Sequence, residues 1–141
     1  MNRKSVLMAL FLSAVLVLYA CENSEAGREG QKNPIKYTIV PADEADDVLI
    51  ETIEKYKQQR FHLTYEDSGR LWAVVGYGTK PTAGYSMTVD EVYECEGNVY
   101  IKTSVIGPQK SDRMPPETTW PYIIIMLDGD FENEAVVFET P

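Results

Sequence analysis

Histidine and cysteine are scarce in this sequence, and acidic residues outnumber basic ones. The 141 residues include one histidine and two cysteines, and 13 Lys and Arg against 22 Asp and Glu give a formal net charge of -9. Nucleic acid and anionic lipid both need a basic surface, so an acidic chain argues against either as a face-on partner. The sequence also lacks a zinc-ligand cluster and a glycine loop that could cradle phosphate. We therefore expect no nucleic-acid partner, no metal and no cofactor.

Residues 1–20 read as an export signal. Asn2-Arg3-Lys4 precedes a dense apolar run that is too short to span a bilayer comfortably. The run ends in Leu18-Tyr19-Ala20-Cys21, which resembles the bacterial lipobox, although tyrosine is an uncommon residue at its middle position. That resemblance implies a diacylglycerol on the thiol of Cys21 and an exported protein held at the extracytoplasmic face of the cell membrane. The alternative is an ordinary cleaved signal followed by an incidental cysteine.

The rest of the chain divides into a polar stretch and one domain. Residues 21–34 contain no aliphatic side chain larger than alanine, so they cannot bury enough surface to fold and are predicted to be a flexible tether. Residues 35–141 have the size of a single domain. If lipid occupies Cys21, Cys95 has no partner for an intrachain disulfide. The domain must then be stabilised by its apolar core.

The spacing of apolar residues predicts one helix followed by strands. Residues 42–60 have helical spacing at Leu49, Ile53 and Tyr56, with acidic residues at the start that suit the helix dipole. A continuous apolar run at 122–127 predicts a central strand buried on both faces. Alternating patterns predict the other strands, at 36–40, 61–66, 71–75, 85–90, 99–105 and 135–138. The expected fold is mostly β or α+β, an antiparallel, sandwich-like β-sheet domain with one N-terminal helix.

Two groups of residues have some of the chemistry of a site but lack its activating context. His62 and Cys95 could form a nucleophile and base, yet nothing in their neighbourhood activates either, so a Cys-His hydrolase is a remote alternative. The acidic stretch 128–139 has a spacing similar to a calcium loop, but Asn133 stands where the sharp turn needs glycine. An acidic hairpin turn, formed around Asp128, Asp130, Glu132 and Glu134, with Glu139 in a strand, is the favoured interpretation.

The most informative stretch is residues 76–85, because three glycines and one proline specify a shaped loop. A second unusual stretch, 107–119, is polar, contains three prolines and leads into Trp120-Pro121-Tyr122. Long connections and preorganised loops in a compact domain often carry function. Simple turn chemistry is the alternative for both. The predicted partner-binding residues are Thr79, Lys80, Pro81, Thr82, Gly84, Tyr85, Trp120 and Tyr122.

These motifs resemble the PrcB C-terminal domain family over about residues 71–138. The matching features are G-x-G-x-K-P-T-A-G-Y-S at 76–86, an alternating strand pair, a Pro-rich loop, and T-x-P-Y with an aliphatic run at 119–127. Members are small exported or lipid-anchored bacterial domains, and the family is named after a lipoprotein subunit of a surface subtilisin-like protease complex. The positions that carry the pattern, Gly76, Pro81, Gly84, Tyr85, Pro121 and Tyr122, are structural markers, and the family defines no catalytic residue.

The stretch 80–85 is also similar to the N-P-T-T-G-Y loop of chagasin-like cysteine-protease inhibitors, which are immunoglobulin-like β folds. Lys80 and Ala83 depart from that loop, the inhibitors' glycine-rich loop is missing, and Trp120-Pro121 reverses their Arg-Pro-Trp order. The resemblances imply a non-enzymatic, lipid-anchored domain that acts as accessory subunit or stabiliser of an exported protease or another surface protein. Inhibition of a papain-like protease is the alternative.

Overall fold

The computed structural model describes residues 30–131 and 134–140. Within it, one compact unit begins at Gln31. The predicted export signal, Cys21 and residues 21–29 of the predicted tether lie outside the described residues. No helix in the described part of the chain is long and apolar enough to cross a membrane.

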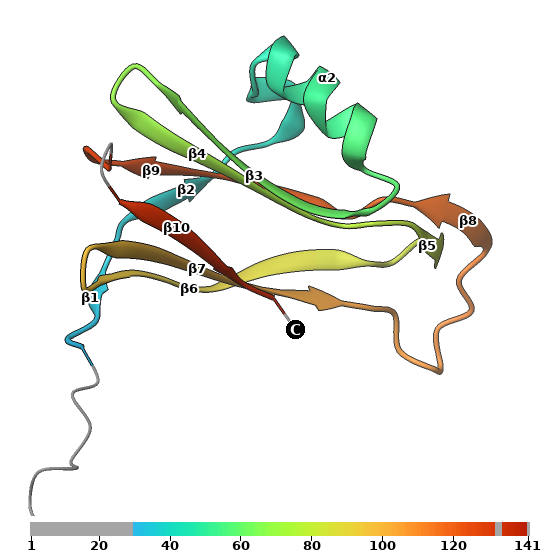
Figure 1. Cartoon of the computed structure of the whole chain (residues 1–141). Coiled ribbons are helices and arrows are strands. Elements are labelled where there is room, and N and C mark those ends of the chain that lie inside the picture. Colours follow the sequence, from blue (N-terminus) through green and yellow to red (C-terminus); the bar gives the residue numbers. More distant parts are fainter. Residues whose placement is uncertain (1–29, 132–133, 141) are drawn as a thin grey trace, which may run out of the picture. The chain divides into compact units, whose positions relative to one another are not determined.

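The unit contains two four-stranded sheets that face each other (Figure 1). The first sheet has the order β1-β6-β7-β10 and the second the order β2-β9-β4-β3. The strands of the first are β1 (Asn33–Pro34), β6 (Ser86–Cys95), β7 (Asn98–Ile106) and β10 (Ala135–Glu139). Those of the second are β2 (Tyr37–Ile39), β9 (Tyr122–Asp128), β4 (Arg70–Tyr77) and β3 (Arg60–Asp67). A third sheet pairs β5 (Lys80–Thr82) with β8 (Pro116–Thr119).

Strand alternation sorts the core into two layers. On β4, Leu71, Ala73 and Val75 face the first sheet and pack with Val99 and Ile101 of β7. The intervening side chain of Val74 faces the other way and forms a second cluster with Leu49 and Ile53 of the helix and with Ile124 of β9. The predicted central strand is confirmed, because β9 lies between β2 and β4 and has buried residues on both faces. The mostly β, sandwich-like fold with one short helix is likewise confirmed.

The helix α2 (Asp47–Tyr56) lies over the outer face of the second sheet (Figure 1) and is shorter than predicted. Pro41 and the extended backbone at Ala45 limit residues Ala42–Glu44 to one 3-10 turn, η1. Asp46 then acts as N-cap, and its side chain accepts a hydrogen bond of 2.8 Å from the backbone N–H of Val48. The expectation of a helix beginning near residue 42 was therefore wrong by about one turn.

Two further features differ from the expected arrangement. The pairing of β10 with β7 is parallel, whereas the other strand pairs are antiparallel. The chain crosses from the second sheet to the first after β9, and so β10 enters beside the start of β7 and runs in the same direction. Pairing of Asn33 and Pro34 with Glu94 and Tyr93 of β6 starts within the stretch that the sequence assigned to a tether.

A candidate partner-binding arm

The two stretches predicted as loops pair with each other and form an arm at one end of the sheets, which we define as residues 79–85 and 116–120 (Figure 1). Lys80 is paired with Thr119 and Thr82 with Pro116. The hydroxyl of Thr119 also donates a 2.8 Å hydrogen bond to the carbonyl of Thr82. The sequence predicted a shaped loop and a Pro-rich connection here, and the structure shows a short strand in each, β5 and β8, which pair with each other.

The base of the arm is fixed to the connection between α2 and β3. The backbone N–H and the hydroxyl of Thr79 donate hydrogen bonds of 3.2 and 3.1 Å to the carbonyl of Gln58. Gly78 makes this approach possible, since its φ is +71° and a Cβ there would lie 3.1 Å from the backbone nitrogen of Arg60. The hydroxyl of Thr79 is thus engaged within the domain.

Basic and aromatic side chains gather where the arm leaves the sheets. The ammonium of Lys80 lies 5.8 Å from the ring centre of Tyr77 and 5.7 Å from that of Tyr85. The guanidinium of Arg60 lies 4.7 Å from the Tyr77 ring, and the buried Tyr77 hydroxyl donates to the carbonyl of Thr103 at 3.4 Å. A cation over an aromatic ring contributes about 0.5–1 kcal/mol at such sites. The two cations form a basic patch on an acidic chain.

The far side of the arm is packed by the Pro-rich connection. Gly84 has φ +87°, and a Cβ there would lie 2.7 Å from Cε of Met114 and 3.3 Å from Cβ of Pro108. The ring of Tyr85 rests against Gly107, where a Cβ would lie 3.0 Å from Cε1 of the ring. The connection 107–115 therefore folds onto the arm and leaves Pro81 exposed at its edge.

Trp120 and Tyr122 have different surroundings, although the sequence grouped them. The Trp120 ring is half-buried, and the ammonium of Lys57 lies 4.4 Å from its centre. Lys57 is in turn paired with Glu54 at 2.6 Å. Tyr122 instead packs with the α2 cluster beside Phe61. Trp120 thus belongs to the arm, and Tyr122 belongs to the layer under the helix.

Comparison with known families places this arm within a recognised segment. The family model described as PrcB C-terminal matches residues 71–128. Residues 71–128 belong to the PrcB C-terminal domain family. No curated protein and no solved structure matches the chain. The PrcB C-terminal segment extends from the start of β4 to the end of β9 and contains the whole arm, whereas α2, β3 and β10 lie outside it.

The structure does not bring together the two residues of the hydrolase alternative. Cys95, inside the PrcB C-terminal segment, is a free thiol at the β6–β7 turn in register with Asn98 and, beyond it, Ala135. His62, outside the segment, stacks on Phe138 with ring centres 4.5 Å apart. Ala135 marks the level of Cys95 along the strands, and Phe138 lies three residues beyond it on β10. The His62 imidazole, which stacks on Phe138, is therefore displaced from Cys95 by roughly 10 Å along the strand direction.

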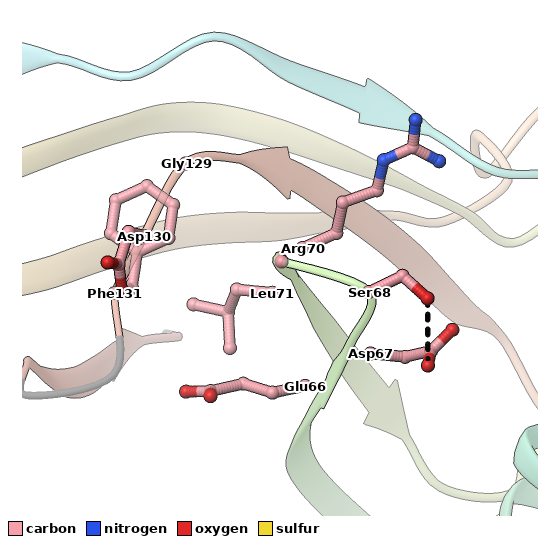
Figure 2. A pocket seen from close by; sticks show the side chains of 9 residues that line it. Glu66, Asp67, Ser68, Arg70, Leu71, Gly129, Asp130 and Phe131 are labelled. Carbon is pink, nitrogen blue, oxygen red and sulfur yellow. Dashed lines mark hydrogen bonds between the residues drawn. The ribbon is translucent and has the colours of Figure 1, made fainter.

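The acidic turns at the other end of the second sheet form a hollow that sequence reasoning did not single out (Figure 2). It has a volume of about 380 Å³ between the β3–β4 turn and residues 129–131. Ser68 donates a 3.1 Å hydrogen bond to Asp67, and Arg70 points away from Glu66 to pair with Asp128 at 3.4 Å. No group of three potential metal ligands occurs among the described residues. The D-S-G and D-G-D turns were the only sequence signals of this hollow.

Sequence reasoning also missed the groups that brace the arm. Gln58, Lys57 and Met114 contact arm residues but carry no pattern that marks them. Pairing of β5 with β8 had no sequence signal either, because residues 116–119 lack apolar alternation. Gly84 and Pro81 were the residues whose types marked the arm in the sequence. They indicated its first segment, residues 79–85, but not its pairing with the second segment, residues 116–120.

Proposed function

We propose that this protein is a non-enzymatic, lipid-anchored domain that binds an exported protease, or another surface protein, as accessory subunit or stabiliser. The observation that carries the proposal is the arm, which projects from one end of the sheets within the PrcB C-terminal segment and presents Lys80 between two tyrosines. Attachment to the extracytoplasmic face of the membrane would come from Cys21.

The bracing of the arm supports binding at low entropic cost. Strand pairing with β8, the hydrogen bonds of Thr79 and the packing of Gly84 fix its backbone before a partner arrives. Ordering a free loop on binding would reduce the affinity, and a preordered edge avoids that cost. Tyrosine, tryptophan and arginine are also the residues that most often dominate the binding energy of protein interfaces.

The charge distribution supports a partner with an acidic contact surface. Lys80 and Arg60 lie at the root of the arm, and both contact Tyr77. On a chain with a net charge of -9, a basic patch of this kind favours contact with carboxylates of a partner. The papain-inhibitor alternative stays a prediction, and strand pairing of residues 80–82 gives it no added support.

The test measures binding of the full chain to a subtilisin-type and to a papain-type protease, together with the activity of each enzyme. We expect binding to the subtilisin-type protease without inhibition, and an affinity loss of about tenfold for Lys80→Glu. Lys36→Glu is the matched control, since Lys36 is an exposed lysine before β2, away from the arm.

Three outcomes would contradict parts of the proposal. Absence of binding to either enzyme would reject proteases of these classes as partners. Equal effects of Lys80→Glu and Lys36→Glu would reject the arm as the binding site. Inhibition of the papain-type enzyme that is abolished by Pro81→Ala with Gly84→Ala would favour the inhibitor instead.

A further inference from the structure

β3 is the edge strand of the second sheet among the residues that the structure describes. β3 is an eight-residue strand at the end of the order β2-β9-β4-β3, and β4 is its one strand neighbour in the described chain. Its sequence, RFHLTYED, contains no proline or lysine, which are residues that commonly block an edge against pairing. An edge of this length presents a row of backbone groups that another strand can pair with.

Apolar side chains are exposed beside this edge. Val48 and Tyr56 of α2 are 71% and 55% exposed, and Tyr65 of β3 is 38% exposed. They line two hollows between α2 and β3, one of about 180 Å³ around Val48 and Leu63 and one of about 470 Å³ around Tyr56 and Phe61. Both hollows are lined by residues of β3, so a strand that pairs with β3 would lie next to them.

The β3–β4 turn sets which backbone groups of β3 point toward the outer edge of the sheet. Ser68 and Gly69 have φ of 52° and 72°, as in a two-residue hairpin turn, and Asp67 pairs with Arg70. In such a hairpin the pair that flanks the turn is hydrogen-bonded, and hydrogen-bonded pairs recur at every second residue. The residues of β3 whose N–H and C=O point outward are therefore Arg60, His62, Thr64 and Glu66.

We propose that two copies of this chain pair through their β3 edges, antiparallel and centred on Leu63. In this register the outward-pointing residues of one copy meet those of the other, and Leu63 faces its own counterpart. Residues that face one another also point to the same side of the joined sheet, because their positions have the same parity. The joined sheet would place the α2 helices of both copies on one face.

The charge order of β3 selects this register and a second copy as the occupant. The strand is basic at its start and acidic at its end, so antiparallel pairing sets Arg60 of each copy opposite Glu66 of the other. Phe61 of each copy meets Tyr65 of the other, close to Tyr56, whose ring centre lies 6.4 Å from that of Phe61. A shift to a centre at Thr64 would instead set Phe61 opposite Asp67, an apolar ring against a carboxylate.

Charge reversal tests the pairing in the full chain by sedimentation equilibrium. We expect Arg60→Glu and Glu66→Arg each to raise the dimer dissociation constant by about tenfold, since each sets like charges opposite one another. A mixture of the two variants should dimerise as the natural chain does, because opposite charges then face one another at both ends of the paired strands. Lys36→Glu is the control and should leave the dissociation constant unchanged.

A cysteine placed at the centre gives an independent readout of the register. In a background of Cys21→Ser and Cys95→Ala, Leu63→Cys should form a disulfide between copies on mild oxidation, since facing residues in a non-hydrogen-bonded pair lie within disulfide reach. Thr64→Cys, one residue away, should not. Far-UV circular dichroism checks that each variant is folded.

The results separate this dimer from the arm and from other occupants. A monomer at every concentration would overturn the pairing and leave the edge for an extended segment of another protein. A dimer that survives both single charge reversals, or a Thr64→Cys disulfide as efficient as that of Leu63→Cys, would overturn the register. Arg60 belongs both to β3 and to the basic patch of the arm, so the Glu66→Arg variant and the Leu63→Cys disulfide, which leave the arm unchanged, separate the dimer from the proposed function of the arm.

Discussion

The carbonyl oxygen of Gln58 accepts both hydrogen bonds that Thr79 can donate, from the backbone N–H at 3.2 Å and from the hydroxyl at 3.1 Å. One oxygen after α2 thus ties the helix layer to the root of the arm. The position of the arm relative to the second sheet follows from this contact and from Gly78 before it.

We expect Thr79→Val to lower the free energy of unfolding by about 0.5–1 kcal/mol, because it removes the hydroxyl bond and keeps the backbone bond. Amide hydrogens of residues 79–82 should exchange faster in the same variant. Urea unfolding and hydrogen exchange measure the two effects. Thr118→Val, at an exposed threonine of β8, is the control. Equal losses in both variants would mean that the Gln58 contact adds no stability.

Gly78→Ala should destabilise the domain more than Gly97→Ala. Both glycines have positive φ, +71° and +75°, so alanine at either position carries the strain of a left-handed backbone, about 1 kcal/mol. A Cβ at Gly97 meets nothing within 4 Å, whereas one at Gly78 lies 3.1 Å from backbone atoms that cannot move aside. We expect a loss of about 2 kcal/mol or more at Gly78. Thermal unfolding of the two variants measures both losses of stability. Equal losses would show that the positive φ alone determines the cost of alanine at these positions.

The contact between Asn33 and Glu94 should make stability depend on pH. The side-chain hydrogen bond from Asn33, at 2.9 Å, and that from the backbone N–H of Gly97 lower the pKa of Glu94 below its ordinary value of 4.5. A carboxyl with a lowered pKa stabilises the folded state fully above its unfolded pKa, and this stabilisation is lost as pH falls through the folded pKa.

Glu94→Gln should therefore be less stable than the natural chain at neutral pH, with a difference that shrinks as the pH falls below about 4.5. Urea unfolding at a series of pH values measures it. Glu117→Gln, at an exposed glutamate of β8, is the control. A difference that is constant from neutral to acid pH would contradict the assigned pKa direction.

Membrane attachment is expected to depend on the thiol of Cys21. Cys21→Ser removes the group that would carry lipid, so the processed chain should leave the membrane fraction for the soluble one. Fractionation of cells followed by mass measurement of the processed protein is the test. Continued partitioning of the serine variant into membranes would show that another feature holds the protein there.

Local patterns were enough to predict the elements whose own residues specify them. The apolar run around Ile124 placed β9 in the centre of a sheet, and Leu49 with Ile53 identified the buried face of α2. The start of α2 was predicted about one turn too early, because the carboxylates before the N-cap Asp46 have the same composition as a first helical turn.

Features that depend on distant residues could not be predicted in the same way. β5 and β8 are more than 30 positions apart, and neither Lys80–Thr82 nor Pro116–Thr119 has the alternation that marks a strand. The direction of β10 depends on which sheet it joins, and its pattern of Val136 and Phe138 fits parallel and antiparallel pairing equally well.

The parallel pairing of β10 with β7 also has a consequence for how the domain is assembled. β6 and β7 are joined by a short turn and can pair as soon as both are made, whereas β10 pairs with residues made about 37 positions earlier and needs the second sheet to guide it across. The first sheet therefore stays one strand short until residues 135–139 have been synthesised. Until then the outer edge of β7 is unpaired, so the domain cannot complete its fold while the chain is still being synthesised.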